Sequence, residues 1–198
     1  EILQVEGENV GYLMYNGFIG DFNSALNDAF GEFQANNVQH LILDFRYNPG
    51  GSVNSATILG SLVTGQFNNQ VYAKLNYNSI QQNNNVDYTF VDEANDNALN
   101  SLNLDKVYVL TTGSSASASE MVINSLSVYI EVVVIGTSTV GKSQASVTLY
   151  DSPDFRRSEA NPSHTYAMQP LVAITVNKDD GQVPVDGINP DIEVSERL

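Results

Sequence analysis

The chain has 198 residues, no cysteine and a formal net charge of −15 at pH 7, with only 8 basic side chains. The missing cysteines exclude disulfides, thiolate metal sites and a cysteine nucleophile, while the acidic excess disfavours binding to nucleic acid or anionic lipid. No run of about 20 apolar residues occurs, so no membrane span is expected, and the length suits one domain.

Strands and helices are predicted to alternate along most of the chain. The helix expected over residues 21–37 has an apolar face that includes Phe22 and Phe30, and Asp21 is its predicted N-cap. The predicted strands are 10–15, 38–45, 71–77, 106–112, 131–137, 145–150 and 171–177, and two further helices are predicted over 52–65 and 117–130. Residues 78–104 are rich in asparagine and predict a long excursion with a short strand near 87–91. This alternation predicts a mixed α/β domain with parallel strands.

The stretch from Gly136 to Ser143 matches the phosphate-loop pattern G-x-x-x-x-G-K-[ST] and follows an apolar strand. The pattern holds a nucleotide only where a helix follows, because the helix N-terminus supplies free amides to the phosphates. Here the residues after Lys142 favour a strand, and Pro153 would end a helix after barely two turns. A nucleotide site is therefore the minor alternative, and Lys142 needs another role.

A second motif, GSSASASEM at 113–121, places Ser117 at the start of a predicted helix. Ser117 and Glu120 form the S-x-x-E pattern of a capping box, so the serine could be only a helix cap. It could instead be a nucleophile, because the helix start offers free N–H donors and the amide of Ala118 could help to hold an oxyanion. The pattern alone leaves both interpretations open.

A nucleophilic serine needs a base, and the two histidines are poor candidates. His40 lies at the start of a core strand and His164 lies in a polar turn, so neither neighbours a motif. A lysine can serve instead when its amine is neutral, which apolar surroundings favour. The apolar run at 132–135 supplies such surroundings before Lys142, although the acidic net charge opposes them.

A third motif ends the strand predicted over 38–45 in the tight turn Asn48-Pro49-Gly50-Gly51. Its glycines leave backbone N–H groups accessible, as an oxyanion hole requires. The neighbouring Asp44 and Arg46 are expected to pair with each other or with nearby groups, and no chemistry is assigned to them.

Together, LILDFRYNPGG, VLTTGSSASASEMVINSL, VVVIGTSTVGKS and GINPDIEV resemble the C-terminal processing peptidases, or tail-specific proteases, in order and spacing across residues 38–194. These are serine peptidases with a Ser/Lys dyad. The resemblance implies an α/β, crotonase-like (ClpP/crotonase-type) mixed sheet with flanking helices. It implies Ser117 as nucleophile and Lys142 as its base. The implied oxyanion hole combines the amide of Gly50 or Gly51 with that of Ala118.

The chain also departs from the family pattern. Members commonly carry a glutamine four residues after the lysine, where this chain has Ser146. Gln144 lies two residues earlier, on the same face of a strand, and is the predicted substitute; Glu120 is the other predicted supporting residue. The PDZ module that captures a substrate's C-terminus in the family is missing from this chain, and 78–104 is an added excursion.

The sequence therefore predicts a serine endopeptidase that cleaves near protein C-termini through an acyl-enzyme, without metal or cofactor. Its expected partner is a peptide or protein substrate bound in extended form; the oligomeric state is open. Residues 1–198 are expected to be the core domain of a longer chain, and the resemblance and the lack of cysteine predict an extracytoplasmic location, periplasmic or in the cell envelope. The alternative is a non-catalytic binding module on the same fold, by analogy with a retinoid-binding protein of the eye.

Overall fold

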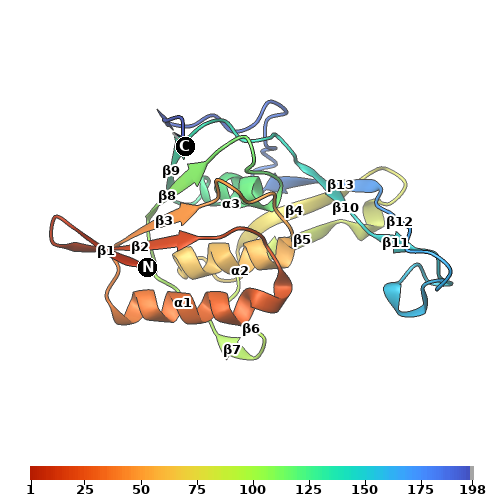
Figure 1. The fold of residues 1–198 in the computed structure, drawn as a ribbon, viewed down its shortest axis with the longest axis horizontal. Helices are drawn as coiled ribbons and strands as arrows, with labels where there is room; N and C mark the ends of the chain where they lie inside the picture. The colour runs from red at the N-terminus through yellow and green to blue at the C-terminus, as the bar shows by residue number, and fades with distance from the viewer. Residues whose placement is uncertain (197–198) are drawn as a thin grey trace.

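A six-stranded sheet runs through the centre of the computed structural model, which describes residues 1–196 (Figure 1). Its strands, in spatial order, are β1 (Ile2–Val5), β2 (Glu8–Met14), β3 (His40–Asp44), β8 (Lys106–Thr111), β9 (Glu131–Gly136) and β14 (Ile192–Glu193). β1 and β2 are antiparallel, and every other neighbouring pair is parallel. The C-terminal ends of β3 and β8 therefore lie side by side. β3 leads into the Gly-Gly turn, and β8 leads into the serine motif.

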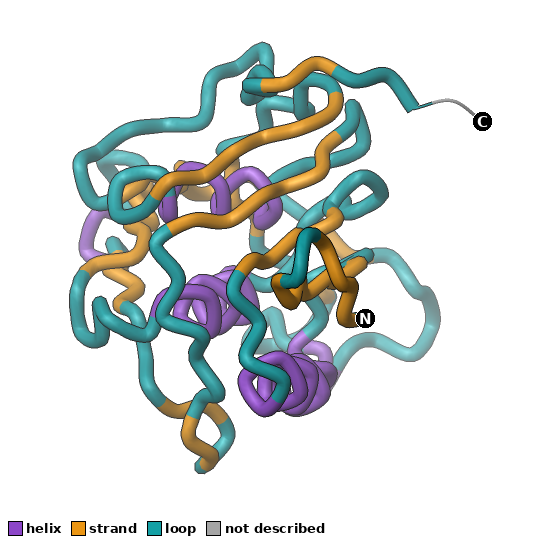
Figure 2. Tube along the Cα trace, turned by 90° about the vertical axis from the view of Figure 1, so that its left-hand side faces the viewer, coloured by secondary structure: helices purple, strands orange, loops and turns teal. Residues whose placement is uncertain are grey.

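A second, antiparallel sheet has the order β10 (Gln144–Ser146), β13 (Leu171–Asn177), β4 (Val71–Tyr77) and β5 (Val86–Thr89). The helices are α1 (Asn23–Ala35), α2 (Val53–Thr64) and α3 (Ala118–Leu126), with short 3-10 turns at Gly20–Phe22, Gln82–Asn84 and Arg157–Glu159. α3 contacts β9 of the first sheet and β4 and β13 of the second. Figure 2 shows the helices among the strands and loops of the molecule.

Two small hairpins complete the fold. β6 (Glu93–Ala94) and β7 (Asn97–Ala98) lie in the excursion, and β11 (Leu149–Tyr150) pairs with β12 (Ala167–Met168). The second hairpin belongs to residues 147–170, here called the arm, which project away from the rest of the molecule (Figure 1). Within residues 1–196, no helix has the length and apolar character needed to cross a membrane.

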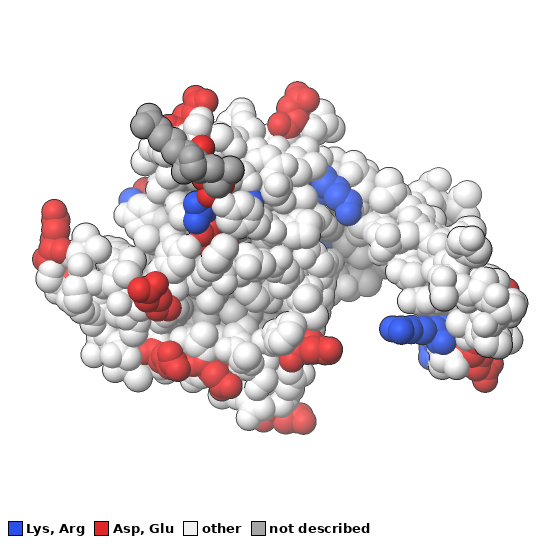
Figure 3. All heavy atoms as spheres, in the orientation of Figure 1, with Lys and Arg blue, Asp and Glu red and all other residues white. Residues whose placement is uncertain are grey.

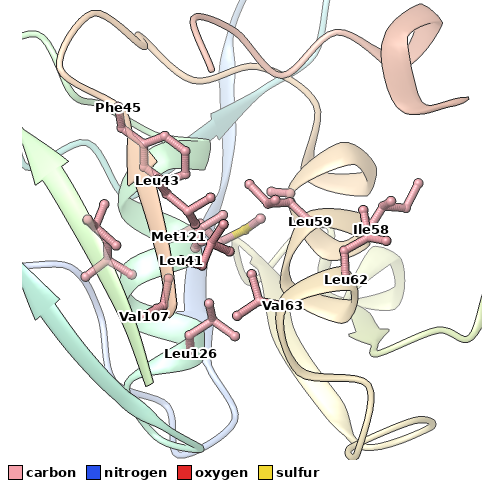
Figure 4. Packing of buried hydrophobic residues seen from close by; sticks show 14 of the residues in the cluster. Leu41, Leu43, Phe45, Ile58, Leu59, Leu62, Val63, Val107, Met121 and Leu126 are labelled. Atoms are coloured by element: carbon pink, nitrogen blue, oxygen red, sulfur yellow. The ribbon is translucent and has the colours of Figure 1, made fainter. Parts of the chain in front are cut away.

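The core lies between the central sheet and the helices, as Figure 4 shows. Alternate residues of β3, such as Leu41 and Leu43, are fully buried there, as strand periodicity requires. They pack in one cluster with Leu59 of α2 and with Met121 and Leu126 of α3. This packing holds the starts of α2 and α3, which carry the two glycine- and serine-containing motifs, in fixed positions.

The predicted mixed α/β architecture is confirmed. The strand predicted over 71–77 has those bounds in β4, and those predicted over 38–45 and 131–137 are β3 and β9. The helix predicted over 52–65 is α2, whose N-cap Ser52 accepts a hydrogen bond from the Ser55 amide. These elements follow the sequence pattern closely because their buried and exposed positions recur with the period of a strand or a helix.

Other boundaries were predicted wrongly. Asp21 is not an N-cap: it lies in the 3-10 turn Gly20–Phe22, and α1 begins at Asn23 without a side-chain cap. The helix predicted to reach 130 ends at Leu126, because the amides of Tyr129 and Ile130 both turn back to the Leu126 carbonyl. The strand predicted over 145–150 is two strands, β10 and β11, which have different partners. β1, β12 and β14 were not predicted.

Candidate active site

Ser117 lies between β8 and α3 in an uncommon backbone conformation. Its φ is +57° and its ψ is −112°, values that a residue with a Cβ adopts only when the surrounding structure enforces them. Gly50 packs directly against it, since a Cβ on Gly50 would lie 2.7 Å from the Ser117 Cβ. The serine and the Gly-Gly turn are thus held together closely enough that only glycine fits at position 50.

Ser117 and Lys142 line the same cavity, which has a volume of about 300 Å³. β10 contributes Gln144 and Ser146, and α3 contributes Met121. The other lining residues are Pro49, Gly51, Val53, Ala118, Ala145, Gln169 and Thr175. The structure therefore brings together the predicted nucleophile, the predicted base and two of the predicted oxyanion residues.

The Glu120 carboxylate joins the serine segment to the lysine segment. The side chain is fully buried, and its Oε2 accepts hydrogen bonds from the amides of Ser117 (2.7 Å) and Lys142 (2.9 Å). Its Oε1 accepts from the Gly141 amide (2.6 Å) and from the Thr139 hydroxyl (2.6 Å). Four donors satisfy the buried charge, so Glu120 positions both catalytic candidates through their backbones.

The same contacts contradict the nucleotide alternative. The amides of Gly141 and Lys142 donate to a carboxylate, and the chain continues as strand β10 rather than as a helix. A phosphate would find no helix N-terminus at this loop, and the amides of Gly141 and Lys142 are already bound to Glu120. The phosphate-loop match from Gly136 to Ser143 is a coincidence of sequence.

Ser143, the residue after Lys142, also holds the backbone of the lysine loop in place. The Ser143 side chain is buried, and its Oγ accepts a hydrogen bond from Gln182 Nε2 at 2.6 Å. The Ser143 carbonyl accepts from both the amide and the hydroxyl of Thr175. Gln182 and Thr175 were not predicted, because nothing in their local sequence pattern marks them as neighbours of the lysine loop.

The two glycines of the turn differ in the availability of their amides. The Gly50 N–H donates to Asn48 Oδ1 at 2.9 Å. The amides of Gly51 and Ala118 make no hydrogen bond to another residue among those described, and both residues line the cavity. Gly51 has a φ of +140°, and a Cβ there would lie 2.2 Å from the Phe18 carbonyl oxygen. Of the two glycines, Gly51 has the amide that is free to face a ligand.

Neither histidine lines the cavity. His40 Nε2 lies 2.6 Å from Glu8 Oε2 where β3 and β2 begin, and His164 Nε2 lies 3.1 Å from Asp151 Oδ2 in the arm. This placement agrees with the expectation that histidine is not the base for Ser117.

The expected pairing of Asp44 with Arg46 is present beside the Gly-Gly turn. Arg46 Nη2 donates to the buried carboxylate of Asp44 at 2.8 Å, and the Tyr12 hydroxyl donates to it at 2.6 Å. Burial by itself would raise the pKa of Asp44, but the hydrogen bonds from Arg46 and Tyr12 outweigh it, so the pKa is lowered. Arg46 also pairs with Glu196 at 2.8 Å. The network anchors the loop that precedes the turn.

Comparisons with known proteins agree with this architecture. A family model described as Peptidase family S41 matches residues 9–194. Two relatives from Staphylococcus epidermidis strains, each named "Probable CtpA-like serine protease", are 27% identical over 179 residues, covering 86% of this chain and 34% of theirs. A relative of the same name from Staphylococcus aureus strain N315 is 27% identical over 139 residues, covering 70% of this chain and 26% of its own. The chain thus spans about a third of the length of these relatives.

Two solved structures resemble this fold. A crystal structure from Bacteroides fragilis NCTC 9343, assigned to the S41 proteases, has a TM-score of 0.88 and 35% identity, covering 99% of this chain and 50% of that one. The photosystem II D1 C-terminal processing protease has a TM-score of 0.69 and 18% identity, covering 97% of this chain and 45% of its own, which shows a shared fold.

Fold and comparisons together define the class as serine-type peptidases with a ClpP/crotonase-like α/β fold, which confirms the predicted fold class. The chain belongs to peptidase family S41. The family resemblance drawn from the four sequence motifs is confirmed as well.

Proposed function

We propose that this chain is the catalytic core of a serine endopeptidase in which Ser117 is the nucleophile and Lys142 is the general base. The observation that carries the proposal is the shared cavity of Ser117 and Lys142, together with one buried carboxylate that binds both backbones. Residues that lie 25 positions apart in the chain would not meet in this way by local structure alone. The family membership supports the same chemistry.

In the proposed reaction, the neutral amine of Lys142 takes the proton from Ser117 Oγ as this oxygen attacks the substrate carbonyl carbon. The protonated Lys142 then gives its proton to the leaving amine, and the peptide bond breaks. Water then attacks the remaining ester as Lys142 takes a proton from it, the bond between the acyl carbon and Ser117 Oγ breaks, and Lys142 returns that proton to Ser117 Oγ. The lysine thus acts in turn as base and acid, and no net proton is gained.

The oxyanion formed in each step needs donors at the cavity wall. The amides of Gly51 and Ala118 are suited to this role, because both line the cavity without another partner among residues 1–196. Loss of one such donor typically costs about 2.7–4 kcal/mol of transition-state stabilisation. The Gly50 amide is bound to Asn48, so the proposal assigns Gly51 rather than Gly50. Gln144, on β10, is a supporting residue for the lysine.

The proposed substrate is an unfolded or extended peptide segment. β10 is the edge strand of the second sheet and lines the cavity, so a peptide could add alongside it through backbone hydrogen bonds. Cleavage near protein C-termini is proposed from the resemblance to C-terminal processing peptidases. We propose that residues 1–198 are the core domain of a longer protein. The CtpA-like relatives and the lack of cysteine support an extracytoplasmic location for that protein.

The test compares Ser117→Ala and Lys142→Ala with the unmodified chain on quenched fluorescent peptides. Each substitution should lower kcat/KM by roughly 10³-fold or more, while circular dichroism spectra stay unchanged. A fluorophosphonate probe should label Ser117, and labelling should depend on Lys142. Full activity in Lys142→Ala would contradict the dyad. No labelling and no hydrolysis by the unmodified chain would favour the alternative of a binding module on this fold.

A further inference from the structure

The asparagine-rich excursion, which the proposed function does not use, forms a polar pocket together with α1. The hairpin of β6 and β7 packs against this helix (Figure 1). Between them lies a pocket of about 270 Å³ that shares no lining residue with the cavity of Ser117 and Lys142. Five of its lining residues are asparagines, and its apolar lining residues are Ala94 and Ala98. Polar side chains therefore form most of the wall.

One of these asparagines fixes the hairpin to the helix. Asn27 is 9% exposed, and its Nδ2 donates to the Ala98 carbonyl at 2.9 Å. Its Oδ1 accepts from the Asn100 amide at 2.8 Å, and its carbonyl accepts from Asn100 Nδ2 at 3.0 Å. Because three hydrogen bonds join the two elements, the pocket is a built part of the fold, as ligand sites usually are.

Asn23 lines the same pocket, but its amide oxygen has no hydrogen-bond partner. The residue is 5% exposed, and its Oδ1 is buried without a donor among residues 1–196. Buried polar side chains are nearly always hydrogen-bonded, so an exception needs an explanation. Leucine would occupy a similar volume at this position without the cost of desolvating an amide. An amide at the wall of a pocket is explained if a ligand supplies the missing partner.

The lining residues define the chemistry of that ligand. No Lys, Arg or aromatic side chain lines the pocket, and Figure 3 shows Asp and Glu, but no Lys or Arg, on the visible surface over α1 and the hairpin. A phosphate, a carboxylate or an aromatic ring would therefore lack its usual partners. A calcium ion usually binds several carboxylates, whereas Asp28 is the lining residue that carries one. The ligand that fits is neutral and polar.

Sugar hydroxyls match this wall. A hydroxyl both donates and accepts hydrogen bonds, an asparagine amide also does both, and a carboxylate accepts from two oxygens. The exposed side chains of Ser24, Asp28 and Asn95 add such groups to the amide of Asn23. The volume lies just below the range of about 300–1,000 Å³ for drug-sized ligands, so the pocket suits one sugar unit rather than a chain of them.

We propose that the pocket between α1 and the β6–β7 hairpin binds one neutral saccharide unit, with hydroxyl groups of the sugar hydrogen-bonded to Asn23, Asp28 and Asn95. This site does not depend on the proposed peptidase activity, because it shares no lining residue with the cavity of the dyad. The sugar can belong to a glycosylated protein or to a polysaccharide, since the unit that enters the pocket is the same.

The experiment is a nuclear magnetic resonance titration of the isotope-labelled chain. The probes are the methyl glycosides of glucose, mannose, galactose and N-acetylglucosamine. A ligand with about a dozen non-hydrogen atoms should bind with a Kd of about 1 mM, and the side-chain amide signal of Asn23 should shift. Two probes should not bind: tetrahydropyran-2-methanol, whose ring carries no hydroxyl group, and the N-acetylated amide of trialanine.

Variants provide the second readout. Asn23→Leu should weaken sugar binding roughly tenfold, while Tm stays equal or rises because the Asn23 oxygen has no hydrogen bond to lose. Asn84→Leu is the matched control, because Asn84 is exposed in the 3-10 turn of the same excursion and does not line the pocket. It should keep full binding. Asp28→Asn keeps an acceptor, so it should weaken sugar binding only several-fold.

No binding of any of the four glycosides, or equal binding by Asn23→Leu and Asn84→Leu, would overturn the proposal. Shifts at Asn23 that calcium chloride or the trialanine amide causes, and no glycoside causes, would also overturn it, since the pocket would then hold a cation or a peptide. A glycosylated peptide and a soluble polysaccharide that carry the bound sugar separate the two sources. Tighter binding of either one than of the methyl glycoside supports the proposal and identifies the source.

Discussion

Glu120→Gln should lower both the stability and the activity of this chain. The carboxylate is fully buried and accepts hydrogen bonds from four donors. Glutamine keeps one oxygen acceptor and places an NH₂ group at the other position, so two donors would face a donor. Each buried donor that loses its acceptor costs about 1–3 kcal/mol, or roughly 2–6 kcal/mol for the pair.

The size of the effect is measurable. For a domain of about 150–250 residues, each kcal/mol shifts Tm by about 2–4 °C, so Tm should fall by about 10 °C. Because Oε2 holds the amides of both Ser117 and Lys142, kcat/KM should fall at least tenfold at a temperature where the variant is folded. The assays are thermal unfolding by circular dichroism and hydrolysis of a quenched fluorescent peptide.

Glu32→Gln is the matched control, because Glu32 lies exposed on α1. It should leave both Tm and kcat/KM unchanged. If Glu120→Gln unfolded at the same temperature as Glu32→Gln and kept full activity, the carboxylate would not hold the two segments together.

Gly51→Ala should lower kcat/KM by at least about 100-fold, because its Cβ would collide with the Phe18 carbonyl oxygen and move the amide. Gly113→Ala, where a Cβ would meet nothing within 4 Å, should retain activity, and an active Gly51→Ala would contradict the assigned donor. Asp44→Asn should make the free energy of unfolding depend less on pH in the acid range. Burial raises the pKa of Asp44 in the folded chain, but the hydrogen bonds from Arg46 outweigh this and lower the pKa. The charged Asp44 therefore stabilises the folded chain above its unfolded pKa of about 3.9, and this stabilisation is lost as pH falls through the lowered folded pKa. Urea unfolding from about pH 2 to 7 checks this, and a constant stability difference between the two chains over that window would count against it.

The agreement between prediction and structure is best where information is local. β4 has its predicted bounds, and Ser52 caps α2, because strand alternation and capping act between residues a few positions apart. The predictions are weaker at boundaries where neighbouring stretches of the chain pair with different strands. Residues 145–150 alternate like one strand, yet β10 pairs with β13 and β11 pairs with β12, with an irregular register between Ala145 and Ser146.

The alternation of strands and helices, the four ordered motifs and, through them, the peptidase family can all be recognised in the amino-acid sequence. It also marked Ser117 and Lys142 as candidates, because a serine before a helix and a lysine before a strand are local features. Those motifs left open whether the serine only caps its helix and which glycine amide is free.

Which groups meet depends on the folded chain. Glu120 bonds to amides that lie 21 and 22 residues later in the chain, and Gln182 bonds to a serine that lies 39 residues earlier. Asn48 binds the amide of Gly50, so Gly51 is the glycine of the turn whose amide stays free. Such contacts arise from the packing of both sheets around α2 and α3, which involves the whole chain, so no short window of sequence can specify them.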